Sequence, residues 1–305
     1  MKKLINISVS FLSNVKNQRA NCGEKFMGNE SLVKKHGDKA YLSAQSIRHA
    51  LIDTMESLNR GFNDTYFSTS DSDINTSDLK AELQENVALD FRGIMLPSEN
   101  VKRYSTIKTN HSFAMEASNL FFDLLLQFKN KTQDHNIVKN EISHRDMFLF
   151  NLSLDVERVL ALDEIAEKQI EKDRIIITKA LVPVIANKKK FVEEKQRRIE
   201  LFLRAIENLH GFANQSRNLI DATPKEIFIV FNHITHDNKY LNFFEKSIEE
   251  RLALLDYCKA NKIDYLLYDS TLASQTDKDL GLAKNVYEVF SQMIGKLNDF
   301  DLSLS

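Results

Sequence analysis

Three polar segments of this chain combine cationic side chains with amide and hydroxyl groups. Arginine and lysine neutralise phosphates, and asparagine can hydrogen-bond sugar or base edges, so such segments can follow a ribose–phosphate chain. Taken alone, each is equally typical of a solvated loop or a capped helix. The candidate side chains in residues 19–25, 43–48 and 211–218 are Arg19, Asn21 and Lys25, then Ser43, Gln45, Ser46 and Arg48, and finally Gln215, Ser216, Arg217 and Asn218.

Residues 43–48 have an additional property because they begin a predicted helix. Ser43 can cap this helix, and apolar residues recur at helical spacing through Leu58. Free backbone N–H groups and the positive end of the helix dipole suit a phosphate, with Gln45 and Arg48 beside them. An ordinary capped amphipathic helix with a polar outer face also fits this pattern.

No catalytic or metal-binding motif is readable in the sequence. It lacks a glycine-rich phosphate loop, a strand-linked Gly-x-Ser-x-Gly and a paired-cysteine motif, and its 8 glycines argue against dinucleotide binding. His233 and His236 are the nearest pair of metal-ligand type, but no third ligand is evident. We therefore predict no catalytic residues, no metal ion and no cofactor. A triad assembled from distant residues would leave no sequence pattern.

The bulk properties indicate one elaborated domain. The chain has 305 residues, of which 43% are apolar. Cys22 and Cys258 match no redox spacing and no segment approaches membrane-spanning length, so we expect a soluble cytoplasmic protein without a membrane partner. The net charge of −2 provides no general affinity for polyanions, but residues 1–60 and 181–220 are basic and residues 61–90 are acidic.

Hydrophobic periodicity predicts the elements that would position these segments. Residues 4–12 alternate as a half-buried strand does. Residues 59–86 read as an insertion, with a short helix at 79–87. Lys102 and Arg103, with Lys108, form a basic connector. The other predicted elements are strands at 91–96, 146–156, 226–231 and 263–268 and helices at 158–181, 191–209, 241–260 and 280–297.

The order of these elements indicates the fold class. A strand, a helix, middle strands, a long helix and another strand fit an α+β fold of the split βαβ type that carries insertions. A doubly wound sheet formed with the C-terminal part is the alternative. Periodicity alone does not separate the two.

Five segments carry a resemblance to a known family. They are residues 11–19 and 211–224, Asn21-Cys22-Gly23-Glu24, Tyr41-Leu42-Ser43-Ala44-Gln45-Ser46-Ile47-Arg48 and Asp90-Phe91-Arg92-Gly93-Ile94-Met95. In their order along the chain they resemble CRISPR-associated RAMP backbone subunits of type I (Cascade) complexes, in the DevR-like, type I-B branch. The resemblance extends from the N-terminus to about residue 232. The segment ending in Met95 departs from the more usual Asp-Leu-Phe-Gly, which could shift the register of Met95 by one residue.

The resemblance implies a single domain over residues 1–305 with a modified RRM (ferredoxin-like) palm. A finger-like insertion would occupy residues 59–89, a thumb-like insertion 117–143, and a C-terminal α/β extension 233–305. It also implies a subunit that is not an enzyme. Copies of it would bind CRISPR guide RNA head to tail in a helical filament, with other Cascade subunits, while the guide pairs with a target DNA strand.

Met95, Lys102 and Arg103 complete the predicted RNA-binding residues. By resemblance Met95 is a wedge between bases, and the alternative is a core methionine at a strand end. Two other functions stay open. A RAMP-type ribonuclease acting on CRISPR or target RNA would need an acid and a base near the groove. A DNA-binding autoregulator would need a basic recognition helix, which is not apparent.

Overall fold

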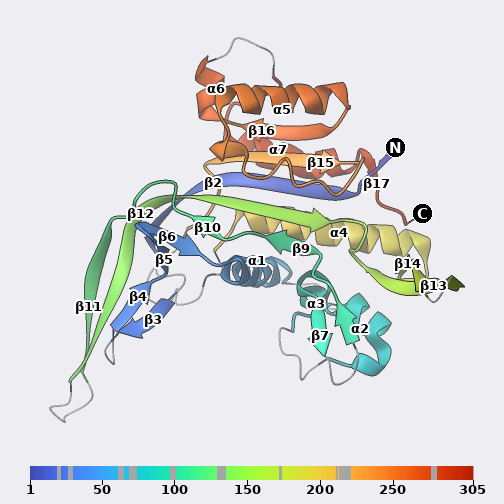
Figure 1. Ribbon diagram of the computed structural model, residues 1–305, viewed down its shortest axis with the longest axis horizontal. Coiled ribbons are helices and arrows are strands. Elements are labelled where there is room, and N and C mark those ends of the chain that lie inside the picture. Colours follow the sequence, from blue (N-terminus) through green and yellow to red (C-terminus); the bar gives the residue numbers. More distant parts are fainter. Residues whose placement is uncertain are drawn as a thin grey trace.

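The computed structural model describes residues 1–18, 22–26, 30–60, 65–68, 74–96, 101–128, 135–171, 174–210, 212, 221–275 and 280–304. Its main sheet is built around β2 (Asn6–Gln18), which lies between β12 (His135–Asp155) and β15 (Glu226–Asn232) (Figure 1). β16 (Asp264–Tyr268) pairs with the outer side of β15, and β9 (Ile107–Thr109) pairs with β12. These pairings are all antiparallel.

β12 extends beyond this part of the sheet as one arm of a long hairpin. Its partner there is β11 (Leu120–Phe128), and Figure 1 shows the hairpin projecting from the body. The other described elements are β1 (Lys2–Lys3), β3 (Cys22–Phe26), β4 (Glu30–Val33), β5 (Lys35–His36), β6 (Lys39–Leu42), α1 (Ala44–Leu58), η2 (Thr76–Asp78), α2 (Leu79–Glu85), α3 (Val87–Arg92), β7 (Ile94–Leu96), β8 (Val101–Arg103), β10 (Ser112–Phe113), β13 (Ala161–Glu171), β14 (Arg174–Pro183), α4 (Lys188–Glu207), η4 (Phe243–Glu245), α5 (Ile248–Ala260), α6 (Ser270–Gln275), α7 (Val286–Leu297) and β17 (Phe300–Asp301).

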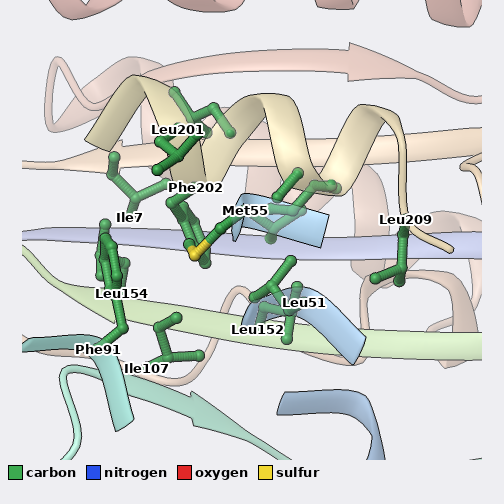
Figure 2. Packing of buried hydrophobic residues seen from close by; sticks show 14 of the residues in the cluster. Ile7, Leu51, Met55, Phe91, Ile107, Leu152, Leu154, Leu201, Phe202 and Leu209 are labelled. Carbon is green, nitrogen blue, oxygen red and sulfur yellow. The ribbon is translucent and has the colours of Figure 1, made fainter. Parts of the chain in front are cut away.

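One face of the sheet carries the main hydrophobic core under α1 and α4. Met55 of α1 and Phe202 of α4 belong to one hydrophobic cluster with Ile7 of β2 and Leu154 of β12, and Figure 2 shows these four side chains between the helices and the strands. All four side chains are fully buried. Because burying a side chain of this size contributes about 1.5–3 kcal/mol, this layer fixes where α1 lies on the sheet.

η4 and α5 cover the opposite face, whereas α7 packs in the main core. A second cluster joins Phe228 of β15 to Phe243 of η4 and Cys258 of α5. Over the central strands the contact is polar, since the backbone N–H of Phe243 donates to Ser10 Oγ at 3.2 Å. β2 is therefore buried on both faces, and the prediction of a half-buried strand is wrong for this strand.

Two other predicted elements are wrong. Residues 158–181 form the β13–β14 hairpin instead of a helix, and the β-branched run of residues 175–178 favours a strand. Residues 91–96 are divided between α3 and β7, because the Asn86 side chain caps α3 and the helix ends at Gly93. A short apolar run does not distinguish a buried helix from a strand.

The predicted α+β class is confirmed, and the doubly wound alternative is excluded. In a doubly wound sheet the strands on either side of α5 would be parallel, but β15 and β16 are antiparallel. The predicted strands at 226–231 and 263–268 and the helix at 191–209 are present. Among the helices that the structure describes, none is long and apolar enough to cross a membrane.

Candidate nucleic-acid interface

A buried carboxylate organises the region around the candidate residues. Asp90 of α3 is fully buried and pairs with the guanidinium of Arg103 in β8. Its other oxygen lies 3.0 Å from Nη1 of Arg198 in α4. The backbone N–H of Leu160 donates to both carboxylate oxygens, at 3.1 and 3.2 Å. Asp90 therefore joins α3, β8, α4 and the turn before β13.

This arrangement removes Arg103 from the predicted RNA-binding residues. Its side chain is 4% exposed, and its guanidinium also donates to the Arg158 carbonyl at 3.0 Å. A buried arginine is costly unless it is paired, and Asp90 supplies the counter-charge. The same surroundings affect α4, where burial lowers the pKa of Lys195 to about 8.

The β7–β8 hairpin presents Met95 to solvent. Met95 pairs in register with Lys102, and both side chains are exposed, Met95 by 65%. Their neighbours Ile94 and Arg103 are buried, as alternation along a strand requires. The interpretation of Met95 as a core methionine is therefore wrong.

Gly93 sets the direction of this hairpin. Its φ is +71°, and a Cβ there would lie 2.5 Å from the carbonyl oxygen of Arg103. Gly93→Ala should therefore lower the free energy of unfolding by about 1–3 kcal/mol, measured by denaturant unfolding. Gly37→Ala is the matched control, because Gly37 has a φ of +62° but no atom within 4 Å of its Cβ position. Equal losses in the two variants would refute the role of the close approach.

A cationic and aromatic strip continues from this hairpin. Lys102 Nζ lies 4.5 Å from the ring centroid of Tyr104, whose side chain is 55% exposed. Tyr104 also lines an open hollow of about 490 Å³ at the start of α1. We call this hollow the first hollow. Met95 and Lys102 thus lie on the same side of the molecule as the first hollow.

The first hollow is lined by basic side chains from three separate segments and by one acidic residue, Asp155, which pairs with Arg158 at 3.3 Å. Arg48 comes from α1, Lys108 from β9 and Arg158 from the turn after β12. Arg158 also pairs with Asp163 at 2.6 Å; burial by itself lowers the Arg158 pKa, but this hydrogen bond and the nearby carboxylates raise it overall. Neither Arg48 nor Lys108 has an ion-pair partner among the described residues. Their charges are available to an anion.

The start of α1 is partly satisfied from within the protein. Ser43 Oγ accepts a hydrogen bond from the Ser46 backbone N–H at 3.3 Å, which confirms the predicted cap. The Ala44 N–H donates to His111 Nδ1 at 3.0 Å. Two of the backbone N–H groups expected to be free are therefore occupied. An anion here would depend mainly on side chains such as Gln45 and Arg48.

Two further hollows adjoin the first. The second hollow, of about 460 Å³, shares Ala44 and Thr109 with it and extends to Phe113 and Asn242. A smaller one of about 210 Å³ shares Arg48 and adds Arg92. We call these three hollows, together with Met95, Lys102 and Tyr104, the α1 surface.

Apart from Arg103, the predicted RNA-binding residues lie at the start of α1, on the neighbouring hairpin, or where the side chain is outside the described part of the structure. Ser43, Gln45, Ser46 and Arg48 lie together at the start of α1, and Met95 and Lys102 lie on the neighbouring hairpin. Lys25 is in β3, but its side chain lies outside the described part of the structure. Six predicted residues also lie outside the described residues: Arg19, Asn21, Gln215, Ser216, Arg217 and Asn218.

Sequence reasoning missed Tyr104, His111, Phe113 and Arg158. His111 and Phe113 are two residues apart, but Tyr104 and Arg158 come from other segments, and no local spacing connects any of them to the start of α1. The described residues contain no group of three His, Cys, Asp or Glu side chains able to hold a metal ion. His236 instead lies 3.3 Å from the Glu157 carboxylate.

Chains from solved CRISPR complexes share this fold. One belongs to a "CRISPR RNA-guided surveillance complex" and matches with a TM-score of 0.53 and 10% identity, over 95% of this chain and 99% of that chain. Another belongs to a "CRISPR RNA-guided surveillance complex, pre-nicking" and matches with a TM-score of 0.56 and 9% identity, over 96% of this chain and 100% of that chain. The fold is thus one found among surveillance-complex subunits.

The family is shown by the sequence. The family model described as "CRISPR-associated negative auto-regulator DevR/Csa2" matches residues 34–230, and the chain belongs to this CRISPR-associated family. The predicted DevR-like membership is confirmed. No curated protein matches the chain.

Proposed function

We propose that this chain binds CRISPR guide RNA along the α1 surface, as a backbone subunit of a type I surveillance complex of the type I-B branch. Copies polymerise head to tail on the guide, in the cytoplasm and beside other Cascade subunits. The guide reads the target DNA strand by base pairing, and the protein contacts the RNA backbone. The observation that carries this proposal is that Arg48 and Lys108 both line the first hollow and that neither has an ion-pair partner among the described residues.

The topology supports an RRM-like palm. Along the chain, β2, α1, β9, β12, α4 and β15 follow one another as βαββαβ, and the sheet order is β15-β2-β12-β9. A ferredoxin-like palm has this element order. Residues 59–89, which include α2, then serve as the finger-like insertion. Residues 117–143, which include β11, serve as the thumb-like insertion, and 233–305 as the C-terminal extension.

The full chain, co-expressed with a CRISPR transcript, should copurify with RNA. Because the sequence contains 0 tryptophans, bound RNA should dominate the ultraviolet absorbance spectrum. The bound polymer should be degraded by ribonuclease and survive deoxyribonuclease. Protein free of nucleic acid, or a clear preference for duplex DNA, would count against the proposal and would favour the autoregulator.

The proposed role does not include catalysis. Labelled guide or target RNA incubated with the purified chain should stay intact, with and without a metal chelator. Cleavage that persists in the chelator and follows the chain through purification would instead identify a metal-independent ribonuclease.

A further inference from the structure

The small sheet formed by β5, β6 and β10 lies beside α1 (Figure 1). An aromatic cluster gathers on this sheet. Tyr41 of β6 and Phe113 of β10 are paired across the strands, with ring centroids 5.4 Å apart. His111 lies 5.7 Å from Tyr41 and 6.3 Å from Phe113. His36 of β5 lies 6.3 Å from Phe113. We call Tyr41, His111 and Phe113 the aromatic platform.

The platform is fixed from below. Leu42 and Ser112, which pair in the same ladder, are buried, so alternation directs Tyr41 and Phe113 outward. His111 accepts the Ala44 N–H through Nδ1, which orients its ring against the start of α1. Phe113 is nevertheless 40% exposed. Part of the Phe113 ring therefore faces solvent and is accessible to a ligand.

The surroundings of the platform are polar and adjoin the cationic hollow. His111 and Phe113 line the second hollow, whose other polar lining residues include Asn110, Asn151, Asn242 and Glu245. The second hollow shares Ala44 and Thr109 with the first hollow, where Arg48 and Lys108 lie. Exposed rings next to amides, with cations in the adjoining hollow, are groups that can recognise an unstacked base and its phosphate.

We propose that the aromatic platform stacks an unpaired RNA base whose phosphate occupies the first hollow. This inference rests on the proposed function, because it assigns a base site to the same RNA. A protein partner is a poorer fit, since the few rings are surrounded by amides and charged groups, whereas the central part of a protein interface is depleted of charge. Stacking tolerates any base, which suits a subunit that must hold guides of different sequence.

The test compares two single-stranded ligands of equal length, an oligouridylate and an abasic tetrahydrofuran analogue with the same phosphates. The unmodified full chain should bind the oligouridylate about tenfold more tightly. Phe113→Ala should remove most of that difference by weakening only oligouridylate binding, and Phe113→Tyr should retain it. Tyr287→Ala, at an exposed tyrosine of α7, is the aromatic control and should change neither affinity. Fluorescence anisotropy measures the affinities, and circular dichroism checks folding.

The other outcomes are distinguishable. If the unmodified chain binds both ligands equally and Phe113→Ala changes neither, the platform does not contact bases, while RNA binding by the α1 surface stands. Equal weakening of both ligands by Phe113→Ala would overturn a stacking role as well. If Phe113→Ala leaves RNA affinity intact but abolishes self-association on RNA, the platform is covered by a second copy and the proposal fails. Binding of neither ligand by the unmodified chain would contradict the proposed function itself.

Discussion

Asp90→Ala is expected to lower the free energy of unfolding by about 3–5 kcal/mol, measured by denaturant unfolding. Arg198 is fully buried and Arg103 nearly so, and each has its guanidinium on the Asp90 carboxylate. Without the carboxylate, two positive charges would stay in the interior with less compensation. The Leu160 N–H would also lose its acceptor.

Asp90→Asn separates charge from shape. It keeps an oxygen that can accept a hydrogen bond from Leu160 but removes the negative charge. It should therefore lower the free energy of unfolding, but by less than Asp90→Ala does. Asp256→Ala, at an exposed position of α5, is the control and should change stability by less than about 0.5 kcal/mol. A loss for Asp90→Ala no larger than that of the control would show that the buried network does not hold this region together.

Reversing the charge at Arg48 and Lys108 together, as R48E and K108E, is expected to weaken binding of single-stranded RNA about a hundredfold at low salt. Each single-stranded phosphate contact contributes about 0.7 to the slope of the logarithm of affinity against the logarithm of salt concentration. Loss of two contacts should therefore reduce that slope by about 1.4. Titrations at several salt concentrations measure both quantities.

A charge-matched control is available on the C-terminal segment. K259E and K284E together make the same change in net charge at exposed positions away from the α1 surface. This pair should lower affinity only slightly. If it weakens RNA binding as much as R48E with K108E, the protein attracts RNA through its overall charge, and the first hollow has no special role.

Local chemistry makes part of the candidate site predictable. The Ser43 cap and the apolar stripe of the following residues specify α1 by short-range interactions, so the positions of Gln45 and Arg48 on one helical turn follow from sequence. The long helix α4 and the strands β15 and β16 are predictable for a similar reason, whereas β9 lies in a segment that the sequence indicated only as a basic connector. The order of motifs also identifies the family.

Residue type alone does not predict which of the basic side chains are buried. Arg48 and Arg103 are equally basic in the sequence, yet one lines an open hollow and the other pairs with Asp90 in the interior. What separates them is Asp90 and its second partner, Arg198, which lies 108 residues away from Asp90 in the chain. A counter-charge at that separation leaves no local pattern.

The sequence by itself determined the strands at 226–231 and 263–268, the helix at 191–209, the capped helix that carries Gln45 and Arg48, and membership of the CRISPR-associated family. Only the tertiary structure decided which faces are covered and which side chains meet. It buried the polar side of β2 under η4, turned residues 161–183 into a hairpin, and brought Tyr41 beside Phe113. The physical reason is that capping and periodicity act within one or two helical turns, whereas burial, ion pairing and strand pairing depend on residues that only folding brings together.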